Sequence, residues 1–506
     1  MNKTNQFEFV CDTAKQAALL TSAADTLEWD ERTGMPSNAG EYRAEQVSCL
    51  RGLAHQRLTD NRYQDQLETL HQRLDLRTDS EYEVITVAQL YRDLQRNNKL
   101  STDLVKKIAS STVRGQQLWD ASRKSNQFSS FKPILNEIIQ LKREVGDLLS
   151  DGSEKSRYES LLDEYEPNAS IDQIDKLFAE LRPPLVDLVQ RIEASKKQPN
   201  PNLFRQDLPL DQQRRLSMGV AQAIGFDFDR GRLDETSHPF CTTLGPHDCR
   251  ILTRYDSYDL GTGLFGTMHE AGHGMYEQGL NTEHFGLPLG SYTSLGIHES
   301  QSRMWENQVG RSYAFWQWVT PRLKDLFPSQ YADVSAKELH FAANEVRPSL
   351  IRVEADEATY NLHIIIRYEL EKQLIQGELD IDDLREAWNS RYQDDLGVTI
   401  SQDRDGVLQD VHWSAGLFGY FPTYTIGNLI AAQLYSEAEN SIDSLDEKIS
   451  QGRFDDLLEW NRSRVHYHGR FKNSEEIVRH ATGKSLSPNY LVSYLKNKLE
   501  LLYEIQ

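Results

Sequence analysis

The stretch "GTMHEAGHGMYEQG", Gly266–Gly279, places two histidines and a glutamate in one short segment flanked by glycines. On a helix, residues four apart lie on the same face, about 6 Å apart along the axis. His269 and His273 can therefore present two imidazoles to one ion, the arrangement that H-E-x-x-H zinc sites use. Glu270, next to the first histidine, lies close enough to accept a proton from a water molecule at that ion. The spacing predicts a helix that carries a metal site with a general base.

A catalytic zinc needs a third protein ligand and one open position. A third histidine six residues beyond the second one, as metzincins have, is excluded because Gly279 stands there. The remaining option is a carboxylate from a later helix, and "GIHESQSRMWENQ" offers Glu299 after a turn-rich segment. The neighbouring His298 would face about 100° away on a helix. Glu277 and Glu283 lie too close to the end of the first helix, so Glu299 is the predicted third ligand.

Most of the chain outside this region shows helical periodicity. In "EYEVITVAQLYRDL", which begins at Glu81, the apolar residues recur every three or four positions. In "SPNYLVSYLKNKLELL", Ser487 is the predicted cap and Pro488 the predicted first helical residue. The exception is residues 230–263, where glycine and histidine accumulate and "CRILTRY" reads as a short strand. The polar breaks are too short for interdomain linkers, so we expect one domain over residues 1–506.

A glycine pattern just before the histidines invites a different interpretation. "GTGLFG", Gly261–Gly266, matches the G-x-G-x-x-G fingerprint of dinucleotide-binding folds. That fingerprint requires a buried apolar strand in front of it, whereas the preceding "RYDSYDL" is polar. We expect the glycines to let the chain enter the following helix tightly instead.

Composition limits the possible partners and compartment. The 506 residues include 77 acidic and 56 basic side chains, which gives a formal net charge of −21. Such an excess repels phosphate backbones and anionic lipids, so neither nucleic acid nor membrane is an expected partner. The N-terminus lacks the pattern of a signal peptide, and four scattered cysteines do not form a disulfide framework. These features predict a cytoplasmic protein with reduced thiols.

Six motifs occur in an order that is specific to one family. They are "HPF" at His238–Phe240, "DCRILTRY" from Asp248, "HEAGH", "HESQS" at His298–Ser302, "IRVEAD" from Ile351 and "GVLQDVHW" from Gly406. On these motifs the chain resembles the carboxypeptidase Taq family of thermostable metallocarboxypeptidases. The resemblance implies a mainly α fold, a large two-lobed helical body with a long central groove and a small β-sheet beside the active site. It also implies a cytoplasmic homodimer with one divalent metal per subunit, zinc by default and cobalt or manganese as alternatives.

The resemblance also assigns roles to individual residues. His269, His273 and Glu299 would bind the metal, and Glu270 would be the general base. Substrate-binding roles would fall to Arg352, which would grip the terminal carboxylate of a peptide, and to His238, Arg250 and His412. We add Tyr420 or Tyr424 as a donor to the oxyanion, because both tyrosines follow the "GVLQDVHW" motif closely.

The expected reaction is release of single C-terminal amino acids from peptides with broad specificity. A water molecule activated by the metal would attack the last peptide carbonyl while Glu270 acts as the general base. One departure from the family pattern is Leu252, which stands where the D-x-R-x-T motif has threonine. Two alternatives stay open: a helical H-E-x-x-H oligopeptidase or dipeptidyl carboxypeptidase, and a catalytically silent peptide-binding protein.

Overall fold

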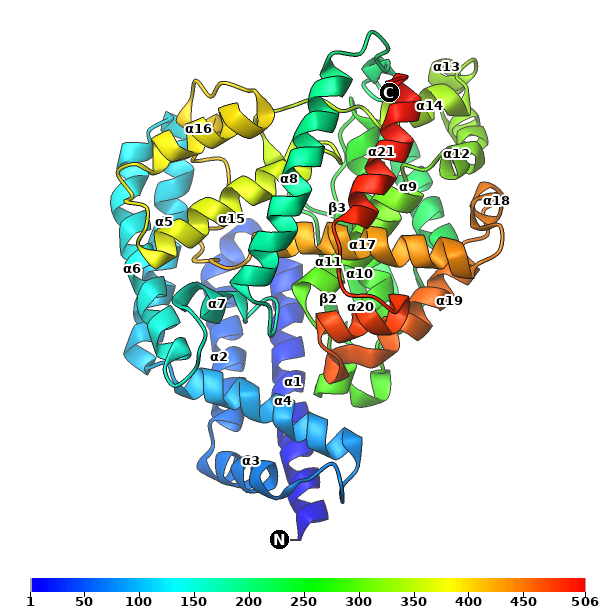
Figure 1. Cartoon of the computed structure of the whole chain (residues 1–506). Coiled ribbons are helices and arrows are strands. Elements are labelled where there is room, and N and C mark those ends of the chain that lie inside the picture. Colours follow the sequence, from blue (N-terminus) through cyan, green and yellow to red (C-terminus); the bar gives the residue numbers. More distant parts are fainter. Residues whose placement is uncertain (1, 506) are drawn as a thin grey trace. The chain divides into compact units, whose positions relative to one another are not determined.

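A computed structural model describes residues 2–505, and 69% of the chain is helical with one three-stranded sheet (Figure 1). The prediction of a mainly α fold with a small sheet is confirmed. The chain divides into two compact units, each assembled from three separate segments. The prediction that residues 1–506 form a single domain with a central groove stays a prediction.

Unit 1 consists of the segment that ends at Asn97, Asn200–Ala343 and Leu434–Ser485. It contains the sheet and most of the helices. Its helices are α1 Lys3–Thr33, α2 Gly40–Leu58, α3 Asn61–Arg73, α4 Glu81–Asn98, α9 Leu210–Ile224, α10 Leu260–Gly279, α11 Leu295–Arg303, α12 Tyr313–Leu326, α13 Pro328–Tyr331, α14 Ala336–Ala343, the C-terminal part of α17 Pro422–Ser441, α18 Leu445–Ser450, α19 Asp455–Arg464 and α20 Ser474–Thr482.

Unit 2 consists of Asn98–Pro199, Asn344–Gln433 and the segment that begins at Leu486. Within residues 2–505 it is built from helices and connecting loops. Its helices are α5 Thr102–Ser125, α6 Phe128–Ser150, α7 Arg157–Leu162, α8 Ile171–Glu193, α15 Tyr360–Gln376, α16 Leu384–Leu396, the N-terminal part of α17 and α21 Asn489–Tyr503.

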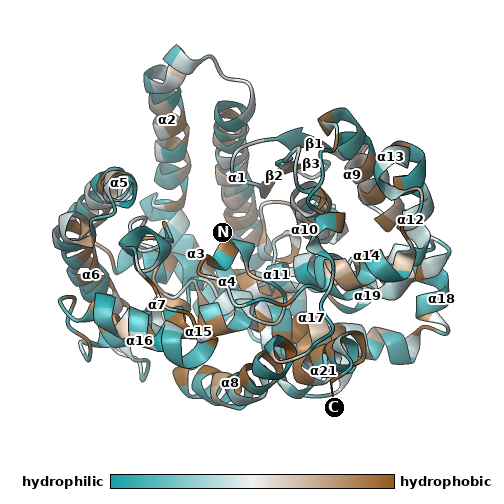
Figure 2. Cartoon of the chain, turned by 90° about the horizontal axis from the view of Figure 1, so that it is seen from above, coloured by the Kyte–Doolittle hydropathy of each residue, from teal (hydrophilic) through white to brown (hydrophobic). Residues whose placement is uncertain are grey.

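The two helices expected from periodicity are present. Helix α4 covers the first pattern and buries Val87 and Leu94. Helix α21 covers the second and buries Leu491, Leu495 and Leu499, but it begins one residue later than expected, after Pro488. Figure 2 shows hydrophobic and hydrophilic residues interleaved along α8 and α21, as expected of helices that contact each other and are buried on one side. Within residues 2–505, no helix combines the length and the apolarity that a membrane span requires.

The sheet has the order β1-β3-β2, with β1 Gly231–Glu235, β2 Phe240–Gly245 and β3 Asp248–Thr253. Strand β3 runs parallel to β1 and antiparallel to β2. The strand expected in "CRILTRY" is therefore confirmed, and it occupies the centre of the sheet. Helix α10 packs directly against β3 and β2, so the sheet lies beside the helix that carries the H-E-x-x-H pattern.

Helix α10 begins earlier than the sequence indicated. Asp259 caps it by accepting hydrogen bonds from the backbone N–H groups of Gly261 and Thr262. The glycines of "GTGLFG" consequently lie inside the helix, and the expectation that they precede it was wrong. Two later glycines permit close packing. A Cβ at Gly272 would lie 2.6 Å from backbone atoms of α11, and one at Gly274 would lie 2.6 Å from the Phe226 ring. The close approach at Gly272 brings α10 and α11 together around the site.

Candidate active site

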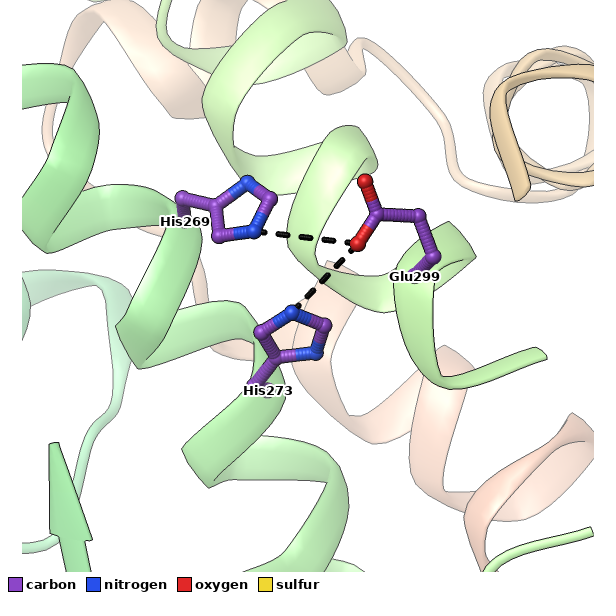
Figure 3. Close-up of side chains that lie close together, drawn as sticks. All are labelled: His269, His273 and Glu299. Atoms are coloured by element: carbon purple, nitrogen blue, oxygen red, sulfur yellow. Dashed lines mark ion pairs between the residues drawn. The ribbon is translucent and has the colours of Figure 1, made fainter. Parts of the chain in front are cut away.

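Helices α10 and α11 bring three potential metal ligands together in unit 1 (Figure 3). His269 and His273 project from successive turns of α10 toward Glu299 on α11. Their Nε2 atoms lie 3.7 Å and 3.5 Å from Oε2 of Glu299. One ligand atom from each of the three residues lies within 4.8 Å of the other two. The structure thus brings together the three residues that the spacing and the "HESQS" motif predicted as ligands.

Each imidazole is oriented by a partner at its other nitrogen. His269 Nδ1 lies 2.8 Å from Oε2 of Glu306 and donates to it, while His273 Nδ1 lies 3.1 Å from the carbonyl oxygen of His298. Carboxylate and carbonyl acceptors at Nδ1 fix the tautomer that leaves Nε2 unprotonated for a metal. Both histidines are therefore oriented as ligands.

His298 links His273 to Glu277, on the side of the imidazole that faces away from Glu299. Its Nδ1 lies 2.5 Å from Nδ1 of His273, and its Nε2 lies 2.9 Å from Oε1 of Glu277. Thr243 of β2 donates to the second oxygen of Glu277 at 2.9 Å. These contacts fit one assignment, in which His273 donates through Nδ1 and His298 donates through Nε2 to the carboxylate. Neither His298 nor Glu277 faces the ligand atoms, which agrees with the sequence-based choice of Glu299.

Burial and neighbouring charges act differently on the two histidines. For His273, burial and the nearby His298 lower the pKa to about 3, so this imidazole is neutral. Burial would also lower the pKa of His269, but the carboxylates of Glu299 and Glu306 outweigh it and raise the pKa above its usual value. In the metal-free protein, His269 therefore binds a proton more readily than an ordinary imidazole does, whereas His273 stays neutral.

The carboxylates of Glu299 and Glu306 are kept ionised by a shared cation. Burial alone would raise both pKa values, but Arg303 and the histidines lower the pKa of Glu299 below its usual range. Arg303 and His269 likewise lower the pKa of Glu306 to about 2. An ionised carboxylate is the form that binds a metal.

Glu270 differs from the other acids at the site. It is buried, and its Oε2 has no hydrogen-bond partner. Burial, reinforced by the nearby Glu299 and Glu306, raises its pKa to about 7. A carboxylate with a pKa near neutrality can accept and return a proton at ordinary pH. This is the environment expected of a general base.

The donor set fits a divalent metal. Two neutral imidazole nitrogens and one carboxylate oxygen are the protein ligands of His₂Glu catalytic zinc sites. Oε2 of the buried Glu270 has no hydrogen-bond partner within the protein, which is unusual for a buried polar atom and is consistent with a contact to a bound group. Among residues 2–505, this trio is the group of three or more ligating side chains close enough to share one ion.

A sequence model of the carboxypeptidase Taq (M32) metallopeptidase family matches residues 10–499. The chain belongs to this family. Membership implies a divalent metal, and the trio of α10 and α11 provides residues that fit one. The fold prediction and the family resemblance drawn from the six motifs are both confirmed.

Relatives of known name span the same length. The chain is 41% identical to thermostable carboxypeptidase 1 of Thermus thermophilus, over 99% of this chain and 98% of the relative. It is 38% identical to carboxypeptidase 1 of Bacillus subtilis, over 97% of each. Its fold matches the crystal structure of the M32 carboxypeptidase from Deinococcus radiodurans R1, with a TM-score of 0.95, 36% identity and coverage of 99% and 100%. The likeness therefore extends over both units.

Two other predicted residues of this M32 chain lie in or beside the sheet of unit 1. His238 is exposed between β1 and β2. Arg250 on β3 forms an ion pair with Asp248 at 2.8 Å, and its guanidinium lies 4.0 Å from the ring centre of Trp29 on α1. Leu252 is fully buried opposite Phe240, so the leucine that replaces the family threonine contributes no exposed surface to this unit.

The remaining predicted residues cluster in unit 2. Arg352 is buried and donates from Nε and Nη2 to Oδ1 of Asp410, at 2.9 and 2.7 Å. Arg367 donates to the other oxygen of Asp410 at 2.5 Å. His412 lies beside this cluster, with Nδ1 3.8 Å from Asp410 and Nε2 3.2 Å from the hydroxyl of Tyr424. Two arginines share one carboxylate, so the cluster carries an excess of positive charge.

Tyr420 lies against the same cluster. Its ring centre is 5.5 Å from that of His412 and 5.4 Å from that of Tyr424. Burial and the adjacent Arg352 together lower the pKa of His412 to about 3, so this histidine is neutral. The structure thus brings Arg352, His412, Tyr420 and Tyr424 together, although they lie up to 72 positions apart in the chain.

Sequence reasoning missed the residues that hold the ligands. Arg303 and Glu306 follow Glu299 by four and seven positions, so a helical pattern of charge was visible in "ESQSRMWE". Asp410, placed between two arginines, stood inside the "GVLQDVHW" motif but was not assigned a role. The contacts of Arg303 and Glu306 depend on how α11 and the segment after it pack, and those of Asp410 depend on how its loop packs against its two arginine partners, which the sequence pattern does not reveal.

Proposed function

We propose that this chain is a metal-dependent carboxypeptidase that releases single amino acids from the C-terminus of peptides, with broad specificity. One observation carries the proposal: His269, His273 and Glu299 converge within 4.8 Å, and the adjacent Glu270 is buried with no hydrogen-bond partner for its Oε2. We assign one metal ion to each subunit, zinc by default and cobalt or manganese as alternatives. The two imidazoles and single carboxylate match the ligand types of catalytic zinc.

When bound, the metal would polarise the scissile carbonyl and lower the pKa of a water molecule. Glu270 is proposed to take the proton of the attacking water and to deliver it to the leaving amine. Its burial and its pKa of about 7 support both steps, because a base must release the proton it has accepted. Glu306 and the carbonyl of His298 keep His269 and His273 from turning away.

Substrate binding is proposed for His238 and Arg250 in unit 1 and for Arg352, His412, Tyr420 and Tyr424 in unit 2. The excess positive charge around Arg352 supports recognition of a carboxylate, which a guanidinium binds with two parallel hydrogen bonds. The Tyr424 hydroxyl, already within 3.2 Å of His412, is a candidate donor to the oxyanion. We also propose that the protein is cytoplasmic and forms a homodimer, both of which the family resemblance supports. Light scattering of the purified protein would test the dimer.

The deciding experiment compares one peptide with a free C-terminus and the same peptide with an amidated C-terminus. The protein is loaded with zinc or cobalt, and released products are followed by mass spectrometry. Stepwise release of single residues from the free acid only would support the proposal. Release of dipeptides, or equal cleavage of both peptides, would favour an oligopeptidase, whereas binding without turnover would favour a silent peptide-binding protein.

A further inference from the structure

Arg303 lies between two carboxylates that surround the proposed metal site. It closes α11 and precedes a π-helical segment, Met304–Val309, that continues the same helical path. Its Nε lies 2.6 Å from Oε1 of Glu299, and its Nη1 lies 3.1 Å from Oε2 of Glu306. One guanidinium therefore bonds both a proposed ligand and the carboxylate that orients a second ligand, His269.

The contact with Glu299 is made at one particular oxygen. Arg303 holds Oε1, whereas Oε2 faces the two histidine nitrogens at 3.7 and 3.5 Å and accepts a hydrogen bond from the Ser302 hydroxyl at 3.2 Å. With Oε1 occupied by a cation, only Oε2 is available to a metal. A carboxylate that lacked this contact would be free to rotate or to bind through both oxygens.

The contact with Glu306 acts on His269. Glu306 accepts from His269 through Oε2, the same oxygen that accepts from Arg303. The fixed planar fork of a guanidinium can hold two carboxylates in a defined relative position, which a lysine ammonium cannot do. Two of the three proposed ligands thus depend on one side chain for their orientation.

We propose that Arg303 is a positioning residue of the metal site, which makes Glu299 a ligand through the single oxygen Oε2 and fixes His269 through Glu306. The inference rests on the proposed role of His269, His273 and Glu299 as ligands. It concerns metal binding alone, so a chain that binds zinc in the proposed way but cleaves no peptide would refute the proposed function and leave this inference intact.

Charge and orientation predict opposite effects of removing Arg303. A cation close to a metal site repels the metal, so loss of the charge alone would tighten metal binding. Loss of orientation would weaken it, because partners that orient metal ligands typically contribute about 10–100-fold to affinity. The direction of the change therefore separates the two roles.

The test measures the zinc dissociation constant of the metal-free full chain by competition with a chromogenic chelator. Arg303→Met should weaken zinc binding by about 10–100-fold. Arg303→Lys keeps the charge but not the fork, and it should weaken binding by about tenfold, the lower end of that range. In the cobalt-substituted Arg303→Met variant, Glu299 should bind through both oxygens, and the higher coordination number should reduce the visible d–d absorption.

Arg214→Met serves as the matched control, because Arg214 forms an exposed ion pair with Glu235 in the same unit, on α9. It should leave zinc affinity and the cobalt spectrum unchanged. Far-UV circular dichroism of the metal-free variants checks their folding, and Arg303→Lys decides the question where Arg303→Met does not fold. Unchanged or tighter zinc binding in the folded Arg303 variant would overturn the proposal, as would weaker binding with an unaltered cobalt spectrum.

Discussion

Replacing Glu270 by glutamine tests the proposed base most directly, because the structure predicts three separate outcomes for one change. The side chain keeps its size but loses the ability to accept a proton. General-base catalysis contributes about 10²–10⁴-fold to rate, which corresponds to about 3–5 kcal/mol of activation free energy. Turnover of a free-acid peptide should fall by that factor.

The other two outcomes concern metal binding and stability. Glu270 is not among the three converging ligand atoms, so the zinc dissociation constant of Glu270→Gln should stay within a few-fold of the original. Its Oε2 is buried without a partner, so the neutral amide replaces a carboxylate whose burial is unfavourable. The metal-free variant should therefore be at least as stable in urea unfolding.

The measurements are steady-state kinetics, chelator competition and urea titration of the same preparations. Glu299→Gln provides a matched comparison, because it changes the same functional group in a proposed ligand and should lose metal affinity as well as turnover. Near-normal turnover of Glu270→Gln with metal bound would refute the base assignment. Loss of metal from that variant would instead show that Glu270 is a ligand.

Three further predictions concern packing, acid and metal. Gly272→Ala would place a methyl group 2.6 Å from the backbone of α11, so it should cost roughly 1–3 kcal/mol of stability in urea unfolding and weaken zinc binding, whereas Gly219→Ala on α9, with open space around it, should cost nothing. Burial alone would raise the pKa of Asp410, but Arg352 and Arg367 hold it below its value in the unfolded chain. The stability that the ionised carboxylate contributes is therefore complete above about pH 4 and is lost in stronger acid. The urea midpoint of Asp410→Asn should accordingly fall less steeply with acid than that of the original protein. Chelation should abolish turnover and lower the melting temperature, and zinc at about 100 times its dissociation constant should restore about 3 kcal/mol; an unchanged melting temperature would argue against a resident metal.

The convergence of His269, His273 and Glu299 could be predicted from the sequence because its signals are local. His269 and His273 are related by one turn of a helix, and Glu299 is the acid that the next helix offers after an obvious turn. The strand in "CRILTRY" was visible for the same reason, since its residue types and its boundaries lie within a few positions. The start of α10 was misjudged because the glycines that suggested a helix entrance serve close packing against other elements instead. For example, a Cβ at Gly263 would lie 2.5 Å from the Tyr255 ring.

The residues around the ligands could not be predicted because their roles arise from tertiary contacts. Glu306 is one surface-type acid among many in the sequence, and only the packing of the π-helical segment Met304–Val309 against α10 brings it to 2.8 Å from His269. The same holds for Asp410, whose two arginine partners lie 58 and 43 positions away. A charged residue acquires such a role through its partners, which a single sequence does not specify.

The two proposed histidine ligands are supported in different ways, and this difference has a consequence for the chemistry. His269 donates to an ionised carboxylate, Glu306, which makes its imidazole a stronger electron donor to a metal. His273 donates to the carbonyl oxygen or to the imidazole of His298, and the carboxylate of Glu277 lies on the other side of His298. The negative charge of Glu306 is in turn offset by Arg303, as is that of Glu299. If no cation offset the charges of Glu299 and Glu306, their negative charge would make a bound metal a less effective Lewis acid. Placing the cation beside Glu299 and Glu306 keeps the proposed ligand Glu299, and the carboxylate that orients His269, in place, while it would limit the negative charge at a bound metal and so favour polarisation of a substrate carbonyl.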